Sequence, residues 1–108
     1  RGTRRLEWSD LSMDAFSYAA QTNPMFERTA RGFRSRIEKY DAQNSTELVQ
    51  TARAFVHCSG DIVDTAKHLH QHPNTVRYRL RRIRTLLDMS DSRDRELLVF
   101  LSLAFLNR

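Results

Sequence analysis

Five arginines stand between Arg77 and Arg84, and no acidic residue separates them. In the same stretch, apolar residues recur at steps of four, three and four, namely Val76, Leu80, Ile83 and Leu87. This spacing predicts a helix with one apolar face. Arginines would cover the rest of the helix, and such a surface fits along a polyanion. A merely solvated face is the weaker interpretation, because solvated charged faces usually intersperse acidic residues.

A helical projection at about 100° per residue orders the other side chains of this helix. The side opposite the apolar face carries Asn74, Tyr78, Arg81 and Thr85. Thr75 and Arg82 border one edge of that exposed side, whereas Arg77 and Arg84 lie nearer the core on the other edge. The free surface is therefore expected to be polar at the start of the helix and basic along its length.

The elements around this helix indicate how it is positioned. His72-Pro73-Asn74 supplies a helix start, because proline suits the first helical position. Upstream, Asp61 to Leu69 is a second, short amphipathic stretch. A helix, a tight connection and a basic helix outline a helix-turn-helix DNA-binding motif, in which the N-terminal part of the second helix enters the major groove. The first N–H groups of that helix would also suit a backbone phosphate.

Each polar side chain of the basic helix then has an expected contact with DNA. The candidates for base contacts are Asn74, Thr75 and Tyr78. Asparagine can bridge adenine N6 and N7, and a threonine methyl group can pack against thymine. The candidates for phosphate contacts are Arg77, Arg81 and Arg82. The sequence does not separate the two roles fully, since any one of these arginines could instead fork onto a guanine.

The rest of the chain predicts an all-α fold, because glycine and proline are few and no stretch alternates with period two. The expected helices span residues 13–21, 24–40, 45–58, 61–69, 73–88 and 93–106. Asn23-Pro24 predicts the start of the second helix. A capping box of Asn44 and Glu47 predicts the start of the third, and Gly60 in the left-handed conformation predicts its end.

Two parts of the chain are expected to differ in role. Residues 45–108 form the predicted helix-turn-helix DNA-binding domain, and residues 1–44 are an N-terminal helical segment or a linker from a missing upstream domain. The chain starts with Arg-Gly rather than Met, which suggests a fragment of a longer protein. The last helix is apolar nearly all round, so it either threads between the other helices or forms a homodimer interface over Leu97–Leu106. We expect some of both, with a dimer favoured.

Composition sets further limits. The net charge of +5 favours a polyanionic partner. Cys58 is the only cysteine, which excludes an intrachain disulfide and is typical of a reducing cytoplasm. The sequence predicts no signal peptide, and its most apolar stretch has ten residues, whereas a bilayer span needs about 20. The sequence therefore predicts a cytoplasmic protein that does not enter a membrane.

Residues 46–106 resemble the C-terminal helix-turn-helix domain of the PucR-type transcriptional regulators, which include purine-catabolism and sugar-diacid regulators. The segments that carry the resemblance are Glu47-Leu48 to Ala54-Phe55, Thr65-Ala66, Leu69-His70, His72 and Asn74 to Ile83. The resemblance implies an all-helical domain that binds promoter DNA as a dimer and sits behind sensory domains that respond to metabolites. The chain departs from the family pattern at Gln71, where an aliphatic residue is usual, and at Pro73, where a basic residue is usual.

The other polar clusters of the sequence do not predict a metal site or a catalytic site. A metal site would draw on His57, Cys58, His68, His70 and His72. The alternating histidines do not share one helix face, and a structural zinc site needs four ligands. His57 and Cys58 are adjacent on a helix and point about 100° apart, so they do not form a nucleophile and its base. We therefore expect no metal, no cofactor and no enzymatic activity.

A second function class remains open from the sequence. In this alternative, the chain is a protein-interaction or dimerisation module whose basic face meets an acidic partner, with the apolar C-terminal helix and the N-terminal helices docking it. RNA binding ranks third, because Tyr78 is the only aromatic residue expected on the exposed face and a stacking platform needs several.

Overall fold

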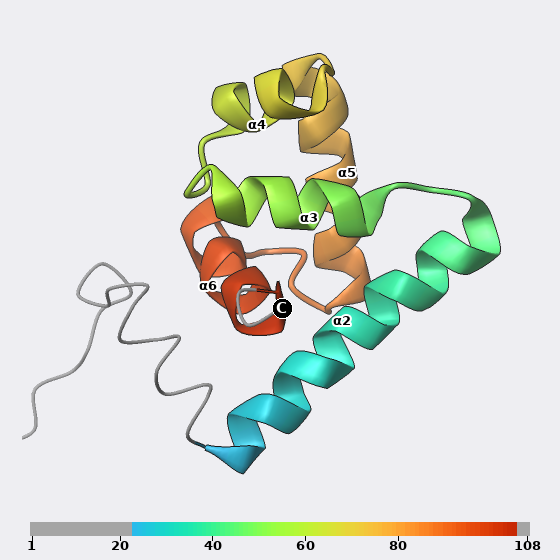
Figure 1. Ribbon diagram of the computed structural model, residues 1–108, viewed down its shortest axis with the longest axis vertical. Helices are drawn as coiled ribbons and strands as arrows, with labels where there is room; N and C mark the ends of the chain where they lie inside the picture. Colours follow the sequence, from blue (N-terminus) through green and yellow to red (C-terminus); the bar gives the residue numbers. More distant parts are fainter. Residues whose placement is uncertain (1–22, 106–108) are drawn as a thin grey trace, which may run out of the picture.

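The computed structural model describes residues 23–105, which form five helices and no strand. These helices are α2 (Pro24–Asn44), α3 (Leu48–His57), α4 (Ile62–Leu69), α5 (Pro73–Leu86) and α6 (Asp94–Phe105). The shorter helices gather along one side of the long helix α2, whose N-terminal end extends away from α4 and α5 (Figure 1). The all-α prediction is confirmed. The helix expected over residues 13–21 lies outside the described residues.

Two helix starts follow the local rules that predicted them. Asn23 precedes α2, and its side-chain oxygen accepts a hydrogen bond from the backbone N–H of Met25 at 2.9 Å. Pro24 then occupies the first turn, where its missing N–H costs nothing. Asp61 caps α4 in the same way, through a 2.9 Å hydrogen bond from the backbone N–H of Asp64. Both starts need only neighbouring residues.

The boundary between α2 and α3 differs from the prediction. Helix α2 continues to Asn44 rather than ending at residue 40, and α3 runs from Leu48 to His57 rather than over residues 45–58. Asn44 lies in the last turn of α2, and its side-chain amide donates to the carbonyl of Tyr40 at 3.0 Å. Glu47 precedes α3 but makes no side-chain cap hydrogen bond. The predicted capping box of Asn44 and Glu47 is therefore wrong.

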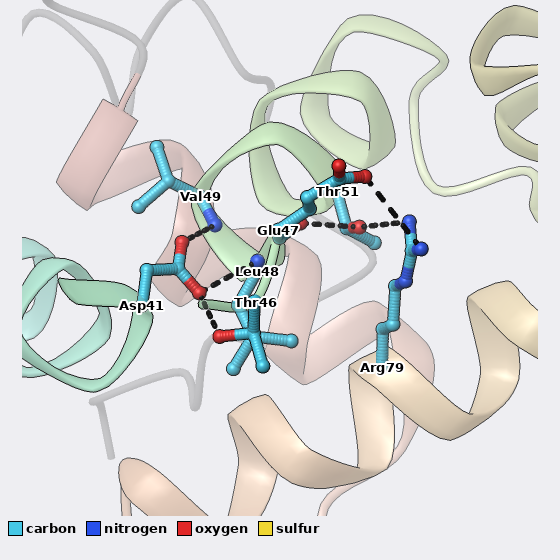
Figure 2. A network of polar contacts seen from close by, with 7 residues as sticks. All are labelled: Asp41, Thr46, Glu47, Leu48, Val49, Thr51 and Arg79. Carbon is cyan, nitrogen blue, oxygen red and sulfur yellow. Dashed lines mark hydrogen bonds and ion pairs between the residues drawn. The ribbon is translucent and has the colours of Figure 1, made fainter. Parts of the chain in front are cut away.

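The cap of α3 comes instead from the preceding helix. The Asp41 carboxylate accepts hydrogen bonds from the backbone N–H of Leu48 at 2.9 Å and of Val49 at 2.8 Å, and from the Thr46 hydroxyl (Figure 2). These N–H groups belong to the first turn of α3, where no helical carbonyl is available to them. A negative charge also suits this end of the helix dipole. Asp41 thus stabilises the start of α3 and fixes the end of α2 to it.

The turn after α3 contains the predicted left-handed glycine. Gly60 has φ +83°, and a Cβ atom at this position would lie 3.1 Å from Cδ2 of Leu98. Ser59 is also left-handed, with φ 55°, and the helix itself ends at His57. Glycine adopts this conformation cheaply, whereas other residues are strained in it.

We expect Gly60→Ala to lower the free energy of unfolding by about 1–2 kcal/mol, from backbone strain and from crowding of Leu98. Gly32 provides a matched control, because it lies in the middle of α2 and an added Cβ would meet nothing within 4 Å. Gly32→Ala should raise the stability by about 0.5–1 kcal/mol, because alanine favours a helix interior. Urea unfolding of both variants checks the prediction, and equal effects at the two sites would contradict it.

One hydrophobic core joins all five helices. Its fully buried side chains are Ile37 of α2, Phe55 of α3, Val76, Leu80 and Ile83 of α5, and Leu97 and Leu101 of α6. Ala66 contributes from α4. Because Ile37 is part of this core, α2 packs directly on the helices that follow it.

Helix α6 is buried on nearly every side within the single chain. Its buried apolar residues are Leu97, Leu98, Val99, Leu101, Leu103, Ala104 and Phe105. Phe100 is half-buried and meets the ring of Phe33 on α2 edge to face, with ring centres 5.4 Å apart. Two roles were expected for this helix. Between Leu97 and Phe105 it packs between the other helices of its own chain, which is the first of them. A homodimer through Leu97–Leu106 remains a prediction, but α6 offers it no exposed apolar face between Leu97 and Phe105.

Candidate nucleic-acid interface

Helices α4 and α5 pack against each other and are joined by residues 70–72 alone. His70 is left-handed, with φ 56°, so the chain turns sharply at the end of α4. The backbone N–H of Gln71 donates to the carbonyl of Ala66 at 2.9 Å, which closes the helix end. His72 then starts α5 by accepting the backbone N–H of Asn74 on its Nδ1 atom at 3.0 Å. A short helix, a tight turn and a basic helix follow one another as predicted.

The first turn of α5 has few free donors. Pro73 has no N–H, Asn74 donates to the His72 side chain, and Thr75 and Val76 both donate to the His72 carbonyl, at 2.9 and 3.3 Å. The expectation that these N–H groups are available to a phosphate is therefore wrong for this structure. A proline and a capping histidine satisfy the end of the helix internally.

The two sides of α5 lie as the helical projection places them. Val76, Leu80 and Ile83 are fully buried. The exposed residues of the opposite side are Asn74, Tyr78, Arg81 and Thr85, and Thr75 at its edge is half-buried. Tyr78 keeps 55% of its surface exposed, an unusual position for a large ring. The helix ends at Leu86 rather than at residue 88, because Asp88 takes a left-handed conformation with φ 58°.

The five arginines divide into two groups. Arg79 and Arg84 form ion pairs with acidic residues outside α5, and their side chains are only 19% and 14% exposed, respectively. Arg79 lies 3.7 Å from a carboxylate oxygen of Glu47 and donates to the Thr51 hydroxyl at 3.4 Å (Figure 2). Arg84 forms an ion pair with Asp94 at the start of α6. The arginine surface is therefore less continuous than the sequence predicts.

The other three arginines form no ion pair with an acidic residue of the described segment 23–105. Arg77 is exposed and donates to the side-chain oxygen of Asn74 at 2.9 Å. Arg81 is exposed as well. The guanidinium carbon of Arg82 lies 5.8 Å from the ring centre of Tyr78 and 5.8 Å from that of Tyr40 on α2. These three are the arginines that the sequence analysis selected for phosphate contacts, and they keep donors free for a ligand.

Tyr78 and Arg82 also form a hydrogen bond, which Arg82 donates to the phenol oxygen at 3.2 Å. This bond lowers the pKa of Tyr78 below its ordinary value, and the nearby charges of Arg82 and Arg81 act in the same direction. The same bond raises the pKa of Arg82, with Tyr40 contributing after it. Two small hollows flank the pair. One of about 390 Å³ has Tyr40 and Gln71 in its wall, and one of about 210 Å³ has Arg81 and Thr85.

The remaining polar clusters do not converge on a site. The ring centres of His57 and His68 lie 5.1 Å apart, yet no three possible metal ligands come together between residues 23 and 105. None of the helices in that range is long and apolar enough to cross a membrane.

Residues 48–106 match the model of the PucR C-terminal helix-turn-helix domain. The chain belongs to this family. Its matched segment is more than half of the chain and includes α3, α4 and α5, together with the described part of α6. The chain thus carries a DNA-binding domain of the helix-turn-helix class, of the kind found in transcription regulation.

Individual relatives match this PucR-type domain over short segments. The chain is 31% identical over 55 residues to the DNA-binding transcriptional activator AdeR of Bacillus subtilis. The matched segment covers 51% of this chain and 13% of AdeR. The chain is also 53% identical over 36 residues to an uncharacterized protein of Mycobacterium tuberculosis. This match covers 33% of this chain and 9% of that protein. The chain therefore spans only a small part of the length of these relatives. No solved structure matches it significantly.

Two residues outside the matched segment 48–106 make contacts that were not predicted from the sequence. Tyr40 is the last residue of the helix predicted over residues 24–40, and its ring meets Arg82 of α5. Asp41 directly follows that predicted helix, and its carboxylate caps α3. Tyr40 and Arg82 are far apart in sequence, and Asp41 lies seven and eight residues before the two N–H groups that it caps. No local motif predicts either contact.

Proposed function

We propose that the chain is the sequence-specific DNA-binding domain of a bacterial transcriptional regulator, with α5 as its recognition helix in the major groove. The observation that carries this proposal is the open side of α5, where Arg77, Arg81 and Arg82 form no ion pair with acidic residues of segment 23–105. Membership of the PucR-type family supports it, as does the likeness to AdeR, which is described as a DNA-binding transcriptional activator. Helix α4 would brace α5 against the DNA backbone.

The proposed division of labour follows exposure and position. Arg77, Arg81 and Arg82 contact phosphates, because charged side chains along the flanks of a recognition helix meet the DNA backbone. Asn74 and Tyr78 are exposed near the start of α5, where a recognition helix meets base edges. Thr75 is half-buried at the edge of this side, and its methyl group would pack against a thymine.

Asn74 and Arg77 are linked before any DNA is bound. The Asn74 side-chain oxygen accepts the Arg77 hydrogen bond at 2.9 Å, while its amide group remains a donor. Reading adenine would require both atoms of the Asn74 amide, one to accept and one to donate. On this proposal, Arg77 releases Asn74 when it moves to a phosphate.

The domain division is also a proposal. Residues 45–108 form the DNA-binding domain, and residues 1–44 form an N-terminal segment. The burial of Ile37 supports a firm connection between α2, the described part of this segment, and the domain.

We expect Asn74→Ala to change base preference more than overall affinity. Loss of one bidentate base contact should cost about 1–3 kcal/mol on a preferred site and little on a random duplex. Selection of binding sites from a random DNA pool, for the parent and the variant, measures this change. Thr85→Ala, at an exposed position late in α5, is the matched control and should leave the preferred sequence unaltered.

Duplex binding at low and high salt tests the function itself. DNA binding through several phosphate contacts should weaken steeply as salt rises. Should the 1–108 chain show no salt-sensitive binding to any duplex, the proposal falls, and the alternative of an acidic protein partner takes its place.

A further inference from the structure

Arg82 contacts two aromatic rings that come from different helices. Tyr78 lies one turn before it on α5, and Tyr40 lies at the end of α2. Both ring centres are 5.8 Å from the guanidinium carbon, a distance at which a cation is attracted to the face of an aromatic ring. The Tyr78 hydroxyl also accepts a hydrogen bond from Arg82 at 3.2 Å. Arg82 is thus oriented by its surroundings, unlike a free surface arginine.

Tyr40 is itself fixed in place. Its side chain is half-buried against the hydrophobic core, and its carbonyl accepts a hydrogen bond from Asn44 at 3.0 Å. The next residue, Asp41, binds the first turn of α3 through Leu48 and Val49. The end of α2 therefore moves with α3, and the Tyr40 ring stays beside α5.

This arrangement affects how easily Arg82 binds a phosphate. A long side chain loses conformational freedom when it is immobilised by a ligand, and a side chain that is already oriented loses less. Contact with a ring face leaves the edge of the guanidinium free, so the N–H donors that do not bond to the Tyr78 hydroxyl can reach a ligand. No acidic residue of the described segment competes for those donors.

We propose that Tyr40 is a positioning residue for DNA binding, whose ring holds Arg82 ready for a phosphate. This inference rests on the proposed function, and it places part of the DNA-binding unit outside residues 48–106, the segment that matches the family. The end of α2 is then required for full affinity as well as for folding.

The test compares Tyr40→Leu with Tyr40→Phe in the 1–108 chain, with binding measured by fluorescence anisotropy on a labelled duplex. Tyr40→Leu removes the ring and should weaken binding about 2- to 5-fold, the range of an exposed cation–π contact. Tyr40→Phe keeps the ring and should bind nearly as the parent does. Gln43→Ala, at an exposed position in the same turn of α2, is the control and should leave binding unchanged.

A double-mutant cycle separates positioning from a general loss of structure. In an Arg82→Ala background, Tyr40→Leu should have no further effect on affinity, because the residue that it positions is gone. An equal loss in both backgrounds, or no loss in either, would overturn the inference. If the parent protein fails to bind any duplex in a salt-sensitive way, the proposed function fails instead, so the two failures are distinguishable.

Arg82→Lys provides a second test if Tyr40→Leu does not fold. Lysine keeps the charge but lacks the planar group that lies against the two rings. We expect a 2- to 5-fold loss of affinity with an unchanged salt dependence. Unaltered affinity in Arg82→Lys would show that the contact of the guanidinium with the two rings does not matter, and the inference would fall.

Discussion

The double variant Arg77→Ala plus Arg82→Ala should bind duplex DNA about tenfold more weakly than the parent, or weaker still, at physiological salt. Each phosphate contact releases condensed counterions from the DNA, so each lost contact makes the slope of log affinity against log salt shallower by about 0.9. Both arginines are free of acidic partners within segment 23–105, and the variant should therefore stay folded. Titration of one duplex at several salt concentrations measures the affinity and the slope together.

The control for this experiment removes two charges elsewhere. Arg28 and Arg31 are exposed residues in the N-terminal half of α2, which lies far from α4 and α5 (Figure 1). Replacing both by alanine lowers the net charge by the same amount but should leave the slope close to that of the parent. If the two double variants change the slope equally, the protein's overall charge drives binding, and the assignment of the α5 face is wrong.

The variant Asp41→Ala should lower the free energy of unfolding by about 1–3 kcal/mol. It leaves two backbone N–H groups of α3, those of Leu48 and Val49, without their acceptor. It also removes the connection that fixes the end of α2 to α3. For a domain of this size, each lost kcal/mol corresponds to roughly 4–8 °C in Tm, so the effect should be visible in thermal unfolding.

Two comparisons make the Asp41 experiment specific. Asp41→Asn keeps one acceptor oxygen and loses the other, so its stability should lie between those of the parent and Asp41→Ala. Glu38→Ala removes another acidic residue from an exposed position of α2 and should change stability by less than about 0.5 kcal/mol. Hydrogen exchange at the amides of Leu48 and Val49 should accelerate selectively in Asp41→Ala. Unchanged exchange there would show that the cap does not protect the helix.

Part of the helical pattern follows from residues within a few positions of one another. Three helices start through contacts that span only two or three residues, at Asn23-Pro24, Asp61 and His72-Pro73. The local sequence therefore determines where these three helices begin. The buried and exposed sides of α5 likewise follow from the spacing of Val76, Leu80 and Ile83. Such features are predictable because a helix repeats every 3.6 residues whatever surrounds it.

Contacts between helices could not be predicted in that way. Asp41 lies seven and eight residues before the two N–H groups that it caps, and the predicted Asn44 cap failed because α2 continues through that residue. Arg79 and Arg84 belong to the basic run by sequence, yet packing brings Glu47 and Asp94 against them.

Sequence alone determined that the chain is helical, that a basic helix follows a short helix and a tight turn, and which residues that helix exposes. The tertiary structure decided which arginines remain free, because an ion pair depends on where the acidic residues of other helices come to lie. It also decided that α6 is enclosed by its own chain, since an apolar surface is equally well buried by neighbouring helices or by a second molecule. The position of Tyr40 beside Arg82 is of the same kind, because two helices must first pack before their side chains can meet.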